Sequence, residues 1–312
     1  MSVLPPARLA EKLAMKILPL AADNRPALEA FLMGAPVYNV FHLSALAEYG
    51  PAGNTNAYSG VWATGAFRGG DLVGAVLGFR GIGGTYCAPG DEEVLQALSR
   101  AVLDRCLSGA LSLLSGHASQ LDPLLPMIGE AGIGRIDRCH FRTLSPHELV
   151  LPAMTPVEGF TLPRLAGPGD MERLIDFYEV GFYSLAHLPS RAAWRSRLSE
   201  QLAFRTLFLI DDRQGRVASA ALTSAEAGGV AMIGGVATRQ EYRGLGLSTM
   251  CVGALCRYLF DTGITCVALF YVKDNHPAAH VYDRLGFRYD GEWLLVPLGY
   301  PPGMGFAAPD AE

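Results

Sequence analysis

The sequence predicts an α/β (α+β) protein made of two tandem domains that share one fold. Half of the 312 residues are hydrophobic and 18% are charged, which is typical of a compact folded chain and excludes a disordered one. A proline-rich stretch without helical periodicity, residues 144–165, divides the chain, and a similar order of elements recurs on each side of it. We predict a boundary near residue 152, which gives domains at residues 1–152 and 153–312.

The first half is expected to begin with a short strand around residues 16–20, followed by helices up to Tyr49. Three strand candidates and a long helix complete the pattern. The strands are expected at residues 57–67, 72–79 and 81–88, and the helix at residues 91–107.

The second half repeats this order. Residues 160–165 predict a strand, residues 170–182 an amphipathic helix with Gly169 and Asp170 as capping candidates, and residues 192–202 a second helix. Three short-linked strands follow at residues 206–211, 217–224 and 230–238, separated by turn residues that include Gly228 and Gly229.

From Leu247, apolar residues fall at helical spacing until Gly263, which supplies a stop. The continuous apolar run 266–272 is typical of a strand buried on both faces. Asn275 and Pro277 then open a helix that ends at Gly286, and residues 293–298 form a strand that closes the sheet.

Charge and cysteine content exclude several classes of protein. The net charge is −5 and no run of lysine or arginine occurs, so a nucleic acid partner is not expected. The N-terminal segment lacks the features of a secretory signal, and no stretch reaches the length of a membrane span, so we expect a cytoplasmic protein without membrane contact. The six cysteines form no CxxC pair and are expected to be reduced core residues: Cys87, Cys106, Cys139, Cys251, Cys256 and Cys266.

The stretch YRGLGLS, residues 242–248, places two glycines where a helix should begin. A helix start leaves main-chain N–H groups unpaired and carries a partial positive charge, so a start without bulky side chains can receive a phosphate group. A Walker loop would need a lysine, which is absent here. A dinucleotide loop would need a third glycine at position 249, which is threonine.

A third pattern fits the stretch. Arg243 is followed by two spacers, then Gly246, one spacer and the small Ser248, and residues 275–287 read NHPAAHVYDRLGF. With these two motifs, residues 160–298 resemble the GNAT superfamily of acyl-CoA-dependent N-acetyltransferases. Ser248 departs from the family's Gly or Ala but is small. The resemblance implies two GNAT-like domains, each with a mixed, mostly antiparallel sheet flanked by helices.

The resemblance also implies roles for individual residues. The main-chain N–H groups of the loop would hold the pyrophosphate of acetyl-CoA, and a main-chain N–H of the preceding strand, at residues 236–238, would polarise the thioester carbonyl. Asn275 would close over the pantetheine, and Tyr282 would lie near the thiol sulfur as the catalytic residue, supplying a proton to the leaving thiolate. The implied acetyl-CoA-binding residues are Val236, Ala237, Thr238, Arg243, Gly244, Leu245, Gly246, Leu247, Ser248 and Asn275.

A catalytic base is missing from the expected place. Many family members carry a glutamate on the strand before the loop, whereas residues 230–238 contain no carboxylate. An alkylammonium with a pKa of about 10 must lose a proton before attack. Other side chains are possible bases, although each is expected to be a surface or packing residue: Tyr178, Glu179, Tyr183, His187 and Glu226.

The first half is expected to bind no coenzyme A. Pro89 removes an N–H donor at the corresponding loop, and Asp91, Glu92 and Glu93 place negative charge there. This half would instead support the second domain or complete an acceptor cleft, and His42 and Tyr49 are possible contributors. The remaining histidines show no metal-ligand pattern, so no metal is expected.

The sequence therefore predicts a tandem GNAT-like enzyme whose second domain transfers an acetyl group from acetyl-CoA to an amine by direct attack. The acceptor amine would belong to a small molecule or a protein. Two alternatives remain: a non-catalytic acyl-CoA-binding regulatory module, favoured by the missing carboxylate, and a transferase that uses aminoacyl-tRNA, disfavoured by the low positive charge.

Overall fold

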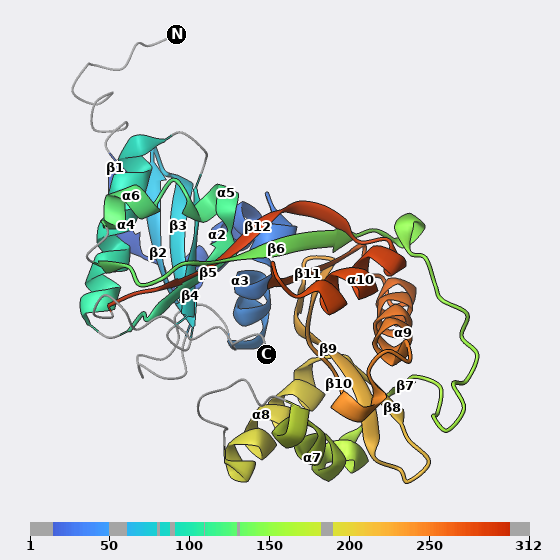
Figure 1. Ribbon diagram of the computed structural model, residues 1–312. Coiled ribbons are helices and arrows are strands. Elements are labelled where there is room, and N and C mark those ends of the chain that lie inside the picture. The colour runs from blue at the N-terminus through green and yellow to red at the C-terminus, as the bar shows by residue number, and fades with distance from the viewer. Residues whose placement is uncertain are drawn as a thin grey trace, which may run out of the picture. The chain divides into compact units, whose positions relative to one another are not determined.

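The computed structural model describes residues 15–49, 61–79, 82–87, 91–108, 110–129, 132–181 and 190–299. The chain folds as two compact units, which divide between Cys139 and His140 and again between Asp290 and Gly291. Unit 1 therefore contains the first part of the chain together with a C-terminal segment, and unit 2 contains the part between them (Figure 1).

The sheet of unit 1 has the strand order β1-β2-β3-β4-β5-β12. Neighbouring strands are antiparallel except β4 and β5, which are parallel. The strands are β1 (Met15–Pro19), β2 (Val61–Arg68), β3 (Asp71–Phe79), β4 (Ile82–Cys87), β5 (Leu113–His117) and β12 (Arg288–Pro297).

Helices cover both faces of this sheet. The helices are η1 (Ala22–Asn24), α2 (Arg25–Leu32), α3 (Pro36–Tyr49), α4 (Glu92–Leu107), α5 (Ala118–Leu121) and α6 (Leu125–Ile128). α4 and α6 share one apolar core with β3, β5 and β12, in which Leu98, Leu114 and Leu294 are fully buried. α2 and α3 contact the strands as well, and Leu32 and Leu46 are buried there.

The sheet of unit 2 has the strand order β6-β11-β10-β9-β8-β7, in which β10 and β11 are parallel and β7 to β10 are antiparallel. The strands are β6 (Asp137–Leu144), β7 (Arg164–Leu165), β8 (Leu207–Asp211), β9 (Val217–Ala227), β10 (Val230–Thr238) and β11 (Cys266–Val272). The helices are η3 (Pro146–Glu148), η4 (Pro168–Asp170), α7 (Met171–Gly181), α8 (Arg191–Phe204), η5 (Gln240–Tyr242), α9 (Leu247–Asp261) and α10 (His276–Leu285).

Side-chain alternation along the strands gives unit 2 two cores. Phe208 and Ile210 point into the core of α9 and α10, whereas Leu207 and Leu209 point into the core of α7 and α8. The sheet is therefore covered by one helix pair on each face (Figure 1). Gly253 lets α9 approach α10 closely, because a Cβ at this position would lie 3.1 Å from Leu285 Cδ2.

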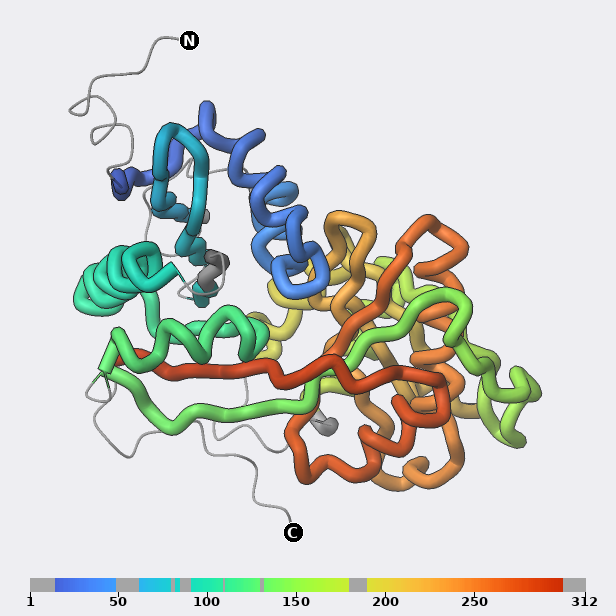
Figure 2. Tube along the Cα trace, turned by 90° about the horizontal axis from the view of Figure 1, so that it is seen from above, coloured from blue at the N-terminus to red at the C-terminus, as the bar shows by residue number. Residues whose placement is uncertain are grey.

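The last strand of each sheet comes from the other half of the chain. β6 follows the elements of unit 1 but joins the sheet of unit 2 beside β11, and β12 follows α10 but pairs with β5 of unit 1 from Trp293↔His117 to Pro297↔Leu113. Figure 2 shows the course of β6 (green) and β12 (red). The compact units thus differ from a simple division near residue 152, because strand pairing, and not the proline-rich stretch, determines which residues pack together.

Most elements of the second half lie where the sequence predicts them. β10 and β11 match the predicted residues, α9 begins at Leu247, and α10 is capped by Asn275 and Gly286. The strand predicted at residues 160–165 is shorter, with β7 limited to Arg164–Leu165. Cys139, Cys251 and Cys256 are buried free thiols, as expected. No helix in the described part of the chain is both long and apolar enough to span a membrane.

Candidate active site in unit 2

The loop between η5 and α9 has a backbone that only glycine adopts readily at two positions. Gly244 and Gly246 have φ angles of +80° and +79°. A Cβ added at either position would meet no protein atom within 4 Å, so both glycines face open space. Between them Leu245 is 46% exposed, whereas Leu247 is buried and begins α9.

The main-chain N–H groups of this loop are available for an anion. The first hydrogen bond of the helix runs from Met250 N to Gly246 O (3.1 Å). Within the described residues, the N–H groups of residues 244–249 have no acceptor. Arg243 precedes them with an exposed side chain. A helix start of this kind favours negative charge. These donors and the open space beside the glycines leave room for an anionic group, and the predicted contact with coenzyme A stays a prediction.

β10 and β11 separate next to this loop. Their parallel ladder runs from Val230↔Cys266 to Ile233↔Leu269 and goes no further, although both strands continue. On the other side of β10, the register with β9 passes from Gly234↔Leu222 to Ala237↔Ala220. Gly235 and Val236 therefore form a bulge opposite the single residue Ala221 of β9. Among the described residues, the second half of β10, which includes the predicted Val236, Ala237 and Thr238, thus has no partner strand on its β11 side.

Side chains fix two carbonyl groups of this segment. The Tyr178 hydroxyl on α7 donates to Gly235 O (3.1 Å), and the Ser219 hydroxyl on β9 donates to Ala237 O (3.0 Å). Ser219 Oγ also lies 2.9 Å from Thr238 Oγ1. The sequence alone gave no sign of these contacts, because the partners are distant in the chain.

Tyr282 lies in the aromatic core between α10 and the sheet. Its side chain is 6% exposed, and its ring centroid lies 5.3 Å from that of Tyr271 and 5.6 Å from that of Phe287. Burial raises the pKa of Tyr282 well above its ordinary value, so the phenol stays protonated at neutral pH. Its predicted position near a thiol sulfur stays a prediction.

Asn275 has a structural task in addition to the predicted one. Its side-chain Oδ1 accepts from Ala278 N (3.1 Å) and so caps α10. The residue is exposed, which leaves its amide group accessible from solvent. Its contact with pantetheine stays a prediction.

The possible bases named from the sequence have different surroundings. Glu226 accepts from Thr206 N (3.0 Å) and from the Thr223 hydroxyl, and Glu179 pairs with Arg191 Nη1 (2.8 Å). Burial raises the pKa of Tyr178, which therefore does not ionise to act as a base near neutrality. Tyr183 and His187 lie outside the described residues.

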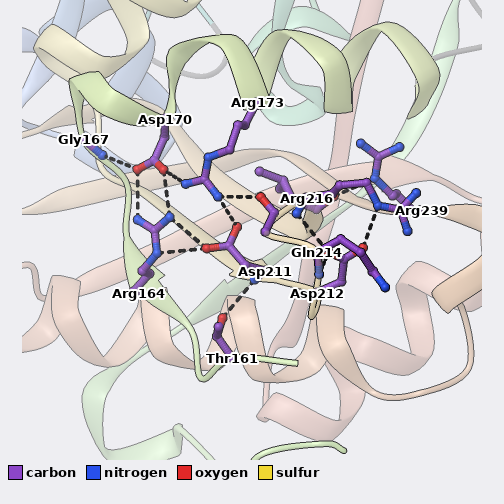
Figure 3. A network of polar contacts seen from close by, with 12 residues as sticks. Thr161, Arg164, Gly167, Asp170, Arg173, Asp211, Asp212, Gln214, Arg216 and Arg239 are labelled. Carbon is purple, nitrogen blue, oxygen red and sulfur yellow. Dashed lines mark hydrogen bonds and ion pairs between the residues drawn. The ribbon is translucent and has the colours of Figure 1, made fainter. Parts of the chain in front are cut away.

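A network of arginines and aspartates holds α7 against the edge of the sheet (Figure 3). Asp170 and Asp211 are each paired with both Arg164 and Arg173, and Asp170 also accepts from Gly167 N (2.9 Å). Hydrogen bonding from Arg164 is the main reason that the pKa of Asp170 lies far below its ordinary value. The network keeps α7, the helix that carries Tyr178, in place.

The same edge of the sheet anchors the start of the glycine loop. The Tyr242 hydroxyl donates to Asp212 Oδ2 (2.9 Å) and accepts from Arg216. Burial alone would raise the pKa of Asp212, but hydrogen bonds from Arg216 N, Tyr242 and the Arg216 guanidinium lower it. Sequence reasoning did not find this contact, although Tyr242 stands next to the predicted loop.

Unit 1 differs from unit 2 at the corresponding helix start and at the corresponding strand separation. At the start of α4, Asp91 accepts from Val94 N (3.2 Å) and pairs with Arg68 Nη1 (2.5 Å), so the protein's own carboxylate occupies the helix start. β4 and β5 also separate after Gly83↔Leu114, but a Cβ at Gly84 would lie 2.5 Å from His42 Cε1. The buried imidazole of His42 therefore lies against β4 where the strands part. The side chain of Tyr49 lies outside the described part.

Within the described ranges, no group of three or more His, Cys, Asp or Glu side chains is arranged to hold a metal ion. The site in unit 2 consists instead of main-chain donors, a separated strand pair and a buried phenol.

Comparison with known proteins agrees with this geometry. Residues 171–287 match the model of the acetyltransferase (GNAT) family. A comparison with proteins of curated function found no match.

Solved structures resemble the chain over most of its length. A tandem GNAT protein from the clavulanic acid biosynthesis pathway has a TM-score of 0.62 and 14% identity, covering 92% of this chain and 99% of that one. A GCN5-related N-acetyltransferase from Sphaerobacter thermophilus has a TM-score of 0.65 and 16% identity, with 98% and 100% coverage. A GNAT acetyltransferase from Colwellia psychrerythraea has a TM-score of 0.60 and 13% identity, with 91% and 100% coverage.

Residues 171–287 therefore form a domain of the GNAT acetyltransferase family. Over most of its length the chain has the fold of these solved structures, one of which is a tandem GNAT protein, and the fold class predicted from the sequence is confirmed. The match over residues 171–287 supports acyl transfer as the general activity.

Proposed function

We propose that unit 2 binds acetyl-CoA and transfers its acetyl group to an amine. The main support is the row of main-chain N–H groups at residues 244–249, which have no acceptor among the described residues. Two glycines beside them leave space for a phosphate group to approach. The family-model match over residues 171–287 supports the same reading.

In this proposal, acetyl-CoA supplies a thioester, whose carbonyl carbon is attacked by an amine and whose sulfur leaves. The loop N–H groups and Arg243 bind the pyrophosphate, and the second half of β10 lies along the arm. Tyr282 donates its phenolic proton to the departing sulfur. Because burial raises its pKa, the phenol is protonated before the reaction.

The chain supplies no carboxylate from β10 to deprotonate the amine, because Val230–Thr238 contains none. An amine that arrives neutral needs no base before its attack. The proton that its nitrogen loses as the amide forms passes to water, and Tyr282 regains a proton from water after giving its own to the sulfur. We therefore expect an acceptor whose amine has a pKa below that of an ordinary alkylammonium, or activity that rises with pH toward about 10.

Binding of the cofactor is tested with two variants of nearly equal shape. Gly246→Asp places a carboxylate beside the loop, whereas Gly246→Asn is similar in size, neutral and tolerant of a left-handed backbone. Calorimetry with coenzyme A should show binding to the wild type, weakened binding to the asparagine variant and none to the aspartate variant. Equal affinity for all three proteins would refute the loop assignment.

A second function is favoured by the missing carboxylate: unit 2 binds acyl-CoA as a non-catalytic regulatory module. Incubation with acetyl-CoA and a broad panel of small-molecule and peptide amines separates the two functions. Release of free thiol together with an acetylated amine, detected by mass spectrometry, supports the enzyme. Acetyl-CoA that binds by calorimetry but survives with every amine supports the module.

A further inference from the structure

Tyr178 connects α7 with the bulge of β10. Its hydroxyl donates to Gly235 O at 3.1 Å, and its side chain is 2% exposed. The ring lies parallel to that of Trp194, with centroids 5.7 Å apart, and contacts Phe177 edge-on. These contacts, and the ion pairs that hold α7, leave the phenol little freedom to move.

The Gly235 carbonyl accepts this bond within an unusual stretch of backbone. Gly235 has a φ of +56°, and a Cβ there would lie 2.9 Å from Leu222 Cδ2 and 3.5 Å from the Tyr178 hydroxyl. Gly234 has no such φ angle, and a Cβ there would lie 2.1 Å from the rotatable Ser224 Oγ. The backbone of Gly235 allows the bulge to form, and Tyr178 holds its carbonyl in one direction.

The direction of this carbonyl fixes the next N–H group. A peptide unit is planar and trans, so the C=O of Gly235 and the N–H of Val236 point in opposite directions. Because the carbonyl points to Tyr178, the N–H of Val236 points away from α7. Neither Gly235 nor Val236 has a ladder partner in β9, and the ladder with β11 has already ended at Ile233.

The resemblance already implies that a main-chain N–H of β10 polarises the thioester carbonyl. We propose that Tyr178 is a positioning residue for this donor: by holding Gly235 O, it aims the Val236 N–H at the carbonyl oxygen of the thioester. A donor fixed in this way stabilises negative charge that develops on that oxygen, without having to reorient during the reaction. This inference rests on the proposed binding of acetyl-CoA. Because burial raises the pKa of Tyr178, the phenol remains a donor across the neutral range.

The test compares two ligands that differ at the carbonyl alone. S-ethyl-CoA has the length of acetyl-CoA but lacks the carbonyl oxygen. Calorimetry measures the ratio of the two dissociation constants for the wild type and for Tyr178→Phe, which loses only the hydroxyl. We expect the preference for acetyl-CoA to fall by about two- to tenfold, the range of one hydrogen bond, while the affinity for S-ethyl-CoA stays unchanged.

Ile175→Val is the matched control. It removes a methylene from a buried side chain of the same helix but leaves the Tyr178 hydroxyl in place. If Tyr178 only stabilises α7, Tyr178→Phe and Ile175→Val should each change the affinities for acetyl-CoA and S-ethyl-CoA by the same factor. An unchanged preference in Tyr178→Phe would overturn the inference, and so would an equal loss of preference in Ile175→Val.

A spectroscopic measurement covers the case in which Tyr178→Phe does not fold. Site-specific 3-fluorotyrosine at position 178 keeps the ring and the hydroxyl, and infrared spectra with ¹³C-labelled acetyl-CoA report hydrogen bonding at the carbonyl. We expect a lowered carbonyl frequency in the wild type and the fluorinated protein. A frequency equal to that in a solvent without hydrogen-bond donors would overturn the inference.

The outcomes separate this inference from the proposed function. If neither ligand binds the wild type, the proposed acetyl-CoA site is wrong and the inference falls with it. If both bind and the preference does not depend on the Tyr178 hydroxyl, the site stands and only the role of Tyr178 is wrong.

Discussion

Two neighbouring tyrosines in unit 2 illustrate how much the surroundings of a phenol decide its role. Tyr282 and Tyr271 have ring centroids 5.3 Å apart, and both are buried. The Tyr271 hydroxyl has no hydrogen-bond partner among the described residues, and a guanidinium, that of Arg142, lies 5.5 Å from its ring centroid. Only Tyr282 stands at the position that the family resemblance assigns to proton donation.

Removing the Tyr282 hydroxyl should therefore affect turnover more than binding. We expect Tyr282→Phe to lower kcat by about 100-fold, which is typical for the loss of a general acid, because the leaving sulfur then receives its proton from water alone. Acetyl-CoA affinity by calorimetry should change little. A kcat equal to that of the wild type, with an acceptor identified from the amine panel, would assign Tyr282 to packing.

Tyr271→Phe is a matched comparison with an opposite expectation. Its hydroxyl is buried and has no partner within the part of the chain that the structure describes, so its removal relieves a desolvated polar group. The free energy of unfolding should stay equal or rise by up to about 1 kcal/mol, with kcat unchanged. A loss of stability in chemical denaturation would indicate that this hydroxyl has a partner such as an ordered water.

At the scale of elements, the arginine–aspartate network around Asp170 is the main polar attachment of α7. The Asp170 side chain is 7% exposed and pairs with Arg164 and Arg173. Each of these partners is itself about one-third exposed, so solvent screens part of the attraction. The network should contribute more to the free energy of unfolding than a surface ion pair does, and less than a fully buried ion pair does.

Asp170→Asn tests this attachment. We expect the free energy of unfolding at pH 7 to fall by about 1.5–3 kcal/mol. Because the folded-state pKa of Asp170 is lowered, mainly by Arg164, its contribution is complete above the unfolded pKa of about 3.9 and is lost as the pH falls through the folded value. The difference between wild type and variant should therefore shrink below about pH 4.

Glu158→Gln provides the control for this experiment. Glu158 pairs with Arg213 on the surface, where the two side chains are 93% and 64% exposed. Its replacement should change stability by less than about 0.5 kcal/mol at any pH. If Asp170→Asn behaves like this exposed pair in denaturation curves, the network does not hold α7.

The elements of unit 2 could be predicted closely because their signals are local. Gly263 and Gly286 mark helix ends, and the apolar run of β11 is bounded by polar residues. The glycine loop could be predicted for the same reason, since φ and residue type are linked. Contacts between distant residues left no such signal: the bond from Tyr178 to Gly235 joins residues 57 positions apart.

At the scale of the whole molecule, each sheet contains a strand from the other half of the chain. Residues 293–297 of β12 pair with β5, and Leu294 and Val296 are buried in the core that α4 covers. Alternating apolar residues predicted the strand but not its partner, because the pattern identifies a buried face and not the neighbouring strand.

Deletion of the chain after Asp290 should consequently damage unit 1 and leave the core of α9 and α10 folded. It removes residues 291–297, most of β12, and so exposes the edge of β5 and the apolar core beneath it. Hydrogen exchange by mass spectrometry should show lost protection in β5 and α4, with α9 still protected. A chain that ends after residue 299 retains every paired residue of β12 and serves as the control. Loss of protection confined to α9 and α10 would contradict this expectation.

The placement of β12 also has a consequence for biosynthesis. A ribosome releases the chain from its N-terminus, and domains generally fold in that order. The sheet of unit 1, although nearly all of it is translated first, obtains its last strand only when residues 293–297 emerge. During most of translation the edge of β5 therefore lacks its native neighbour. Unit 1, most of which is synthesised first, is completed only after the elements of unit 2 have been synthesised.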